Sequence, residues 1–158
     1  MTPDNYDVGT CSPDSLGNGD LGVCLDIISA GAAVDPDSAA KELSLATLLA
    51  VARHEGIIVG VGAIKRVRCG YTVSISKMSH HDFPSVTPEL GYVAVHADHQ
   101  GHRLSSRIAI ALVTGHPGPL FATTSNPRMK ATLGKAGFVH EGRGWDGQSG
   151  VLSLWIKG

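Results

Sequence analysis

Residues Glu89 to Leu112 read ELGYVAVHADHQGHRLSSRIAIAL, and this stretch decides the fold. Its first part, Leu90–Val95, is mostly apolar on both alternating faces, which is typical of a strand buried on both sides. A polar turn with a glycine follows at residues 98–102, and apolar residues then recur at helical spacing at Leu104, Ile108, Ala111 and Leu112. Because the first turn of a helix has unpaired N–H groups and a partial positive charge, this order of elements favours phosphate binding.

The residues before this stretch predict two helices and a β-hairpin. The first helix covers Leu21–Ala30 with Asp20 as its N-cap, and the second begins at Pro36 after a capping aspartate. Two apolar runs around a glycine-containing turn predict the antiparallel hairpin, at residues 47–53 and 57–64. Residues 1–19 are rich in Asp, Gly, Ser and Pro, and we expect them to be irregular apart from a short edge strand at Tyr6–Val8.

The remaining segments predict a strand, a loop and a closing β-α-β-β unit. Alternation at residues 71–75 favours a strand, and the polar segment 77–88, with two prolines, favours a surface loop. A short strand is expected at Leu120–Thr124, followed by a helix that Asn126 caps and Pro127 begins. Two closing strands are expected at residues 138–141 and 151–156, around a loop at 142–150.

The composition restricts the class of protein. A chain of 158 residues with 42% hydrophobic and 17% charged residues favours one folded domain over a disordered chain. The net charge of −1 gives no overall field that would attract nucleic acid or an anionic membrane. Three widely spaced cysteines give no disulfide framework, and the given sequence has no apolar run near the ~20 residues that cross a bilayer. Residues 1–7 lack the basic and apolar pattern of a signal peptide, so we expect none there. We therefore expect a soluble cytoplasmic protein with no membrane contact.

Two segments carry a resemblance to a known family. Gln100–Ser105 resembles motif A of the GNAT N-acetyltransferase superfamily, Q/R-x-x-G-x-G/A, although Arg103 and Ser105 stand where the family has small residues, the first of them a required glycine. The segment Asn126–Phe138 resembles the family helix N-x-x-(A/M)-x-x-L-Y-x-K-x-G-F. The resemblance covers about residues 20–158 and implies an α+β fold, with a mixed central sheet of about six to seven strands flanked by about four helices. It places the whole chain, residues 1–158, in a single GNAT-like domain.

The resemblance also implies an activity. It suggests an acetyl-CoA-dependent N-acetyltransferase that passes an acetyl group to an amine by direct attack in a ternary complex. The strand before motif A would bind the pantetheine arm through its backbone and splay away from the next strand, while the turn and helix start would hold the diphosphate. The residues implied in cofactor binding are Tyr92, Val93, Ala94, Val95, Gln100, Gly101, His102, Arg103, Leu104, Ser105 and Asn126. Because dimers are common in the family, the resemblance also suggests a homodimer.

Two residues are candidates for proton transfer. The resemblance implies Glu89 as the candidate base, because several family members use a glutamate near the start of this strand. Strand periodicity would place it on the face of Gly91, Val93 and Val95, at the edge of an apolar cleft. The family's usual acid is a tyrosine in the helix after Asn126, but here Leu133 fills that slot. Either Ser125 or a water molecule is then the acid, or no acid is needed. The acceptor groove would be walled by the loop between the first two helices and by the loops at 77–88 and 142–150.

Other patterns suggest alternatives. The run His80-His81-Asp82 has no third ligand at useful spacing, so we predict no metal site. A basic cluster, defined as Lys65, Arg66, Arg68 and Lys77, is expected to be a solvated face, or else a contact to nucleic acid or to the 3′-phosphate of CoA. One alternative is thus an enzyme of the same fold that modifies a nucleic-acid base or bound amine. Another is a CoA-binding module without catalysis, since Arg103 and Leu133 depart from the family pattern.

Overall fold

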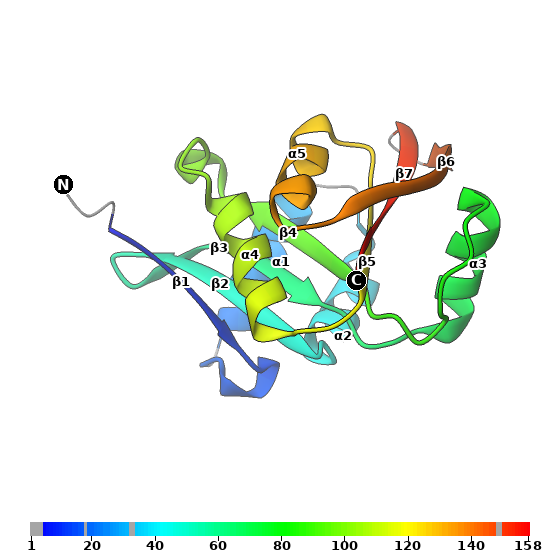
Figure 1. The fold of residues 1–158 in the computed structure, drawn as a ribbon. Helices are drawn as coiled ribbons and strands as arrows, with labels where there is room; N and C mark the ends of the chain where they lie inside the picture. The colour runs from blue at the N-terminus through cyan, green and yellow to red at the C-terminus, as the bar shows by residue number, and fades with distance from the viewer. Residues whose placement is uncertain (1–4, 18, 32–33, 148–149) are drawn as a thin grey trace.

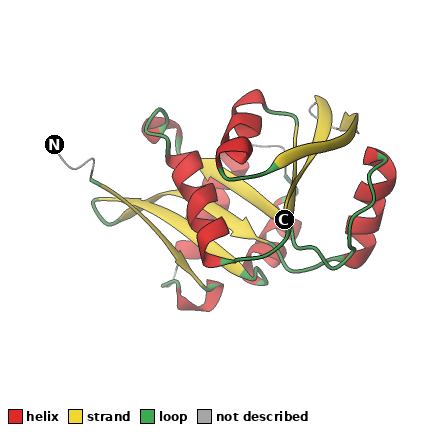
Figure 2. Cartoon of the chain, in the orientation of Figure 1, coloured by secondary structure: helices red, strands yellow, loops and turns green. Residues whose placement is uncertain are grey.

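The structure is a computed structural model that describes residues 5–17, 19–31, 34–147 and 150–158. Within these residues the chain forms seven β-strands and five α-helices (Figures 1 and 2). The strands are β1 Tyr6–Cys11, β2 Leu48–His54, β3 Ile57–Ile64, β4 Leu90–Val95, β5 Leu120–Thr124, β6 Val139–Gly147 and β7 Gly150–Lys157. The helices are α1 Asp20–Gly31, α2 Pro36–Ser44, α3 Cys69–Ser79, α4 Leu104–Gly115 and α5 Pro127–Lys135, with short 3-10 helices η1 Pro13–Ser15 and η2 Ala97–His99.

The strands form two sheets that meet between β4 and β5. The first sheet has the order β1-β2-β3-β4 and the second the order β5-β7-β6, and all of these pairings are antiparallel. In the described chain, β4 and β5 are joined by one parallel bridge between Glu89 and Phe121, where the Phe121 amide donates to the Pro88 carbonyl at 3.1 Å. Beyond this bridge the two strands belong to separate sheets, as the predicted splay requires.

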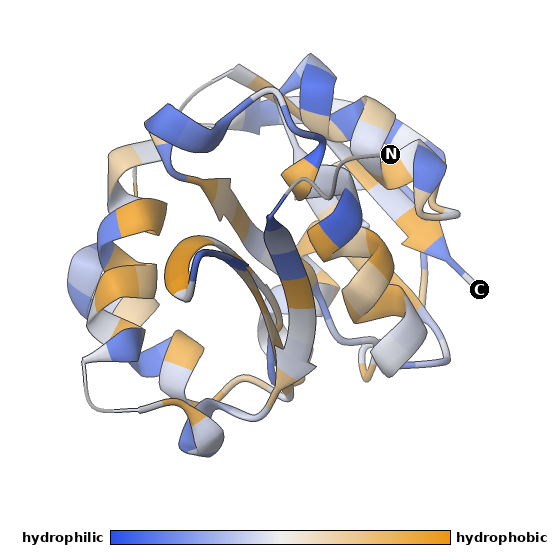
Figure 3. Ribbon diagram, turned by 90° about the vertical axis from the view of Figure 1, so that its left-hand side faces the viewer, coloured by the Kyte–Doolittle hydropathy of each residue, from blue (hydrophilic) through white to orange (hydrophobic). Residues whose placement is uncertain are grey.

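Helices cover both faces of the first sheet. Along β2, Ala50 and Ala52 pack in one apolar cluster with α4, whereas Leu49 and Val51 pack in another with α1. Because successive strand residues point to opposite faces, α4 and α1 lie on opposite sides of this sheet. Hydropathy colouring shows apolar and polar segments alternating along the helices, as expected for helices with one buried side (Figure 3). The sheet is thus held between two apolar layers, and the edge of β4 toward β5 is left for the site.

Several elements confirm the prediction from sequence. The hairpin is β2 and β3, and α5 begins after Asn126. The carboxylate of Asp35 accepts from the Ser38 amide at 3.2 Å, as expected for the N-cap of α2. Asp20 is the first residue of α1 and not its cap, and its carboxylate accepts from the Gly17 amide at 3.0 Å. The edge strand expected at Tyr6–Val8 is present and extends to Cys11, so much of the segment predicted to be irregular is regular.

The strand predicted at residues 71–75 is wrong, because this segment lies in α3. Its buried residues are Thr72, Ile75, Ser76 and Ser79, which lie three, four and seven positions apart and so form one helical face. Three of the four are small and polar, and they leave no apolar helical pattern in the sequence. Val73, which suggested strand alternation, is 43% exposed. α3 packs against β6 and β7 at the end of the molecule away from β1 (Figure 1).

Two of the loops expected to wall the acceptor groove are also shorter than predicted. Residues 77–79 finish α3, and residues 142–147 extend β6 beyond the predicted strand end. The glycines in this segment suggested a loop. Gly142 instead lies at an irregularity in the β6–β7 pairing, with a φ of +69°. A Cβ at this position would overlap the Ser79 carbonyl. Residues 32–33 and 148–149, which belong to the predicted groove loops, lie outside the described residues.

The contact between α4 and β3 gives a stability prediction. A Cβ added to Gly62 of β3 would lie 2.5 Å from Cγ2 of Ile108, a residue of α4 that is fully buried in the core. We expect Gly62→Ala to lower the free energy of unfolding by about 1–3 kcal/mol through overpacking. The matched control is Gly22→Ala in α1, where a Cβ meets nothing within 4 Å and alanine should stabilise the helix by about 0.5–1 kcal/mol. Urea denaturation measures both changes, and equal effects would contradict the packing argument.

Candidate active site

The turn between β4 and α4 is open to solvent and has an unusual backbone. Gly101 has a φ of +92°, and a Cβ there would meet nothing within 4 Å. Arg103, the N-cap of α4, has a φ of 58°, and its side chain makes no capping hydrogen bond. The amide groups that begin α4 are therefore not capped by Arg103. An uncapped helix start beside an open glycine turn fits an anionic group such as a diphosphate.

Strand β4 is interrupted by a bulge at Tyr92. This tyrosine has a φ of 55°, which costs about 1–2 kcal/mol for a residue with a side chain, and the pairing with β3 changes register between Val61 and Ala63. The bulge breaks the strand's period of two. Val93 and Val95 pack with the α4 cluster, whereas Tyr92 packs with the α1 cluster.

The predicted placement of Glu89 on the face of Val93 and Val95 is therefore wrong. The Lys65 ammonium lies 3.1 Å from the Glu89 carboxylate and 4.2 Å from the centroid of the Tyr92 ring. A Cβ on Gly91 would also meet the Lys65 side chain. Glu89, Gly91 and Tyr92 thus share the Lys65 side of the strand, because the bulge inserts one residue before Val93.

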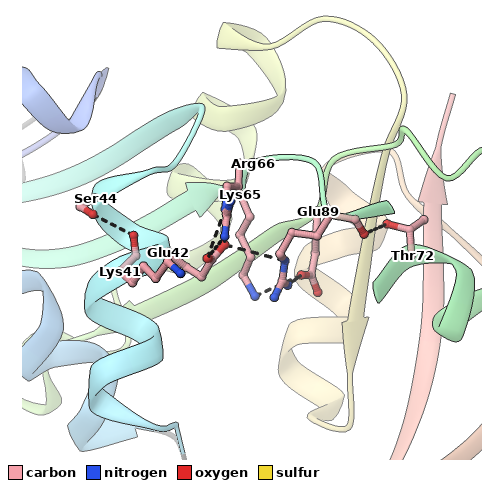
Figure 4. Close-up of polar contacts among 8 residues, drawn as sticks. Lys41, Glu42, Ser44, Lys65, Arg66, Thr72 and Glu89 are labelled. Atoms are coloured by element: carbon pink, nitrogen blue, oxygen red, sulfur yellow. Dashed lines mark hydrogen bonds and ion pairs between the residues drawn. The ribbon is translucent and has the colours of Figure 1, made fainter. Parts of the chain in front are cut away.

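Glu89 is buried among charged groups. It is only 6% exposed and pairs with Lys65 at 3.1 Å and with Arg68 at 3.2 Å. Arg68 also lies 3.8 Å from the buried carboxylate of Glu42 on α2, which in turn pairs with Arg66 at 2.8 Å (Figure 4). The surroundings of Glu89 are therefore ionic and not the apolar cleft edge that the sequence suggested.

The charge network accounts for most of the basic cluster. Hydrogen bonding from Arg66 lowers the pKa of Glu42 below its usual range, against the opposing effect of burial. Lys65, Arg66 and Arg68 each have a carboxylate partner in this network. Lys77, the fourth member, is an exposed residue in the last turn of α3. Two carboxylates thus offset half of the four positive charges of the cluster, which weakens the case for a nucleic-acid contact.

Tyr71 is a site residue that the sequence did not reveal. Burial and the nearby Glu89 carboxylate raise the pKa of the Tyr71 phenol far above its usual value, while a hydrogen bond with Thr123 of β5 acts in the opposite direction. The Arg68 guanidinium lies 4.3 Å from the Tyr71 ring centroid. Tyr71 therefore links Glu89 at the start of β4 with Thr123 on β5. Because it stays protonated at neutral pH, it can donate a hydrogen bond there.

The arrangement of strands, turn and helix matches solved structures. No family model and no curated protein sequence matches the chain. An acetyltransferase of the GNAT family from Streptococcus agalactiae superposes with a TM-score of 0.70 and 14% identity over 98% of this chain and 95% of that chain. A ribosomal-protein-alanine N-acetyltransferase from Brucella melitensis gives 0.68 and 18% identity, over 96% and 98%. A GNAT family acetyltransferase from Elizabethkingia anophelis with acetyl-CoA bound gives 0.62 and 12% identity, over 98% and 99%.

The chain has the GNAT fold. In the described residues, the seven strands agree with the number expected from the resemblance. The helix beyond the four expected is α3, which contains the residues 71–75 predicted to be a strand. The resemblance in residues 100–105 and 126–138 thus corresponds to similarity in structure along nearly the whole chain.

Within this GNAT fold, α5 has the capping asparagine of the family pattern but lacks its tyrosine. The side chain of Asn126 accepts hydrogen bonds from the Arg128 amide at 2.8 Å and the Met129 amide at 3.4 Å, so its capping role is established. Leu133, in the family's tyrosine slot, is fully buried in the core and has no proton to donate. Ser125, the candidate acid, is partly exposed between β5 and α5.

Two further expectations concern metals and membranes. Among the described residues, no group of three or more His, Cys, Asp and Glu side chains could hold a metal ion. His80 ends α3 in the left-handed conformation, and His81 lies 3.7 Å from Glu141. No helix in the described part of the chain has the length and apolar character needed to cross a bilayer.

Proposed function

We propose that the protein is an acetyl-CoA-dependent N-acetyltransferase that passes an acetyl group directly to an amine acceptor in a ternary complex. The observation that carries this proposal is the separation of β4 and β5 beyond their bridge, next to the start of α4, which its N-cap Arg103 does not cap. An opening of this kind offers backbone groups to an extended arm and amide groups to a diphosphate. The fold shared with an acetyltransferase that holds acetyl-CoA supports the same conclusion.

The residues at the opening suit CoA by their chemistry. The amide groups of residues 100–105 would hold the diphosphate, and Gly101 lets the backbone approach because no side chain intervenes. Arg103, which is exposed, would add a charged partner for a phosphate. Backbone groups of Tyr92–Val95 would bind the pantetheine arm, with Asn126 as a further hydrogen-bonding group. When bound, acetyl-CoA supplies an acetyl group activated as a thioester.

The chain's own groups would move the protons. Glu89 would accept a proton from the acceptor ammonium, directly or through water, while Lys65 and Arg68 hold its carboxylate in place. A backbone N–H of β4 would donate to the thioester oxygen, and the Ser125 hydroxyl would give a proton to the leaving sulfur. A covalent acyl-enzyme is disfavoured at Cys24, because burial raises the pKa of this thiol to about 11.

Calorimetry with CoA, followed by turnover of acetyl-CoA with a panel of amines, tests the proposal. The panel contains polyamines, amino-acid amides, aminoglycosides and peptides with free N-termini, and thiol release reports transfer. We expect CoA binding together with thiol release that depends on one class of amine. CoA binding without transfer to any amine would support the non-catalytic module, and absence of CoA binding would contradict both. Salt-sensitive binding of DNA or RNA would instead support the nucleic-acid alternative.

A further inference from the structure

Tyr6, the first residue of β1, connects the N-terminal strand with the turn before α4. Its hydroxyl lies 2.9 Å from Nδ1 of His99 in η2, although the two residues are 93 positions apart. Its backbone carbonyl accepts from the Arg107 guanidinium on α4 at 3.0 Å. One buried residue is thus bonded both to the turn and to the helix that follows it.

Imidazole rings surround the Tyr6 side chain. The centroids of the His54, His102 and His99 rings lie 4.7, 4.9 and 5.7 Å from that of Tyr6. His99 and His102 belong to the turn, whereas His54 ends β2. Tyr6 therefore fills the space between the turn and the first sheet, with its ring packed against both and its hydroxyl directed to the turn.

The turn combines an unusual backbone with a set of local hydrogen bonds. Gly101 and Arg103 both have positive φ, and residues 100–103 are exposed. Its local hydrogen bonds include His99 N–H to the His96 carbonyl at 2.9 Å and the Gln100 side chain to the Val95 carbonyl at 3.3 Å. An outside contact such as that of Tyr6 reduces the number of conformations that the turn can adopt. A turn held in one conformation loses less entropy when it binds an anion.

We infer that Tyr6 is a positioning residue that holds the β4–α4 turn in the conformation that receives the CoA diphosphate. Its hydroxyl fixes the turn through His99, and its carbonyl fixes the first turns of α4 through Arg107. The effect on CoA rests on the function proposed above, whereas the effect on the turn does not depend on it.

Tyr6→Phe tests the inference, because it removes the hydroxyl and keeps the ring among the imidazoles. Hydrogen exchange in the free protein should become about five- to tenfold faster at the hydrogen-bonded amides of the turn, those of Asp98 and His99, as expected for loss of one hydrogen bond. CoA should bind about five- to tenfold more weakly by calorimetry, with kcat unchanged at saturating acetyl-CoA. Thr10→Val, which removes a hydroxyl from the same strand away from the turn, is the matched control and should change neither quantity.

A pair of substitutions at His99 checks that the hydrogen bond carries the effect. Asparagine offers an acceptor atom near the position of Nδ1, so His99→Asn should retain most of the protection and affinity. His99→Leu should behave like Tyr6→Phe, and combining it with Tyr6→Phe should add little, because both changes remove one interaction.

Each outcome decides the inference. Unchanged exchange at the Asp98 and His99 amides in Tyr6→Phe would overturn it, as would faster exchange of similar size throughout the chain, which indicates a general loss of stability. A fall in kcat at unchanged CoA affinity would also overturn it. If the unsubstituted protein fails to bind CoA, the proposed function fails, while the exchange data still decide whether Tyr6 fixes the turn.

Discussion

Replacing Ser105 with glutamate should weaken CoA binding about a hundredfold while making the free protein slightly more stable. Ser105 is the second residue of α4, so a carboxylate there would lie where we place the diphosphate. Two charges ~5 Å apart repel by about 3 kcal/mol at an effective dielectric constant of 20, and 1.4 kcal/mol corresponds to a tenfold change in affinity. In the free protein the same carboxylate faces the positive end of the helix, which stabilises it by about 0.3–1 kcal/mol.

Calorimetry with CoA and urea denaturation without it measure the two opposing effects. Thr114→Glu is the control, because it adds the same charge at an exposed position nine residues further along the helix, ~13 Å away. It should leave CoA binding nearly unchanged and should not stabilise the helix. Equal CoA affinity in Ser105→Glu and the unsubstituted protein would show that the diphosphate is bound elsewhere.

Glu89→Gln should lower both stability and turnover, by separate mechanisms. The substitution leaves the partly buried Lys65 and Arg68 cations without a full counter-charge, and breaking a buried ion pair in this way costs up to about 3–5 kcal/mol. If Glu89 is the base, kcat should also fall about 10²- to 10⁴-fold. CoA affinity should change little, because the turn around Gly101 lies at the other end of β4.

Glu42→Gln separates these two effects. Glu42 is a buried carboxylate of the same network, paired with Arg66 and near Arg68, but it has no part in the proposed proton transfer. It should lose a similar amount of stability in urea and keep most of its turnover at a temperature where both variants are folded. Turnover of Glu89→Gln close to that of Glu42→Gln would mean that Glu89 has only a structural role. If Glu89→Gln does not fold, adding Lys65→Met removes the uncompensated charge and allows the comparison.

Much of the fold is encoded in short local signals and could be predicted from the sequence. Asp35 and Asn126 each cap a helix, and each is followed by a proline at the first helical position, where proline loses no hydrogen bond. These two pairs mark the starts of α2 and α5. The β2–β3 hairpin follows from two apolar runs around Gly56. α3 was missed because its buried face consists mostly of Ser and Thr, and hydrophobic periodicity does not detect such a face.

The candidate site was only partly predictable, because its details depend on contacts between distant segments. Nothing in the sequence shows that Tyr92 adopts a positive φ, yet this one residue changes the face on which Glu89 lies. Lys65 lies beside Glu89 because β3 pairs with β4, and the Lys65 amide donates to the Glu89 carbonyl at 2.8 Å. Tyr71 lies on α3 and Tyr6 on the edge strand β1. Both elements are distant from β4 in the sequence and come close to it only in the folded chain.

In the described residues one backbone bridge, between Glu89 and Phe121, joins the two sheets, so their backbones are connected at one point along β4 and β5. Backbone hydrogen bonds therefore do little to oppose a change in the angle between the two sheets. That angle must be set by side-chain packing and by any molecule bound between β4 and β5. A bound molecule with amide groups would form hydrogen bonds with the free edges of β4 and β5, where the chain's own strands are not paired. The range of angles between the two sheets would then be narrower with that molecule bound than without it.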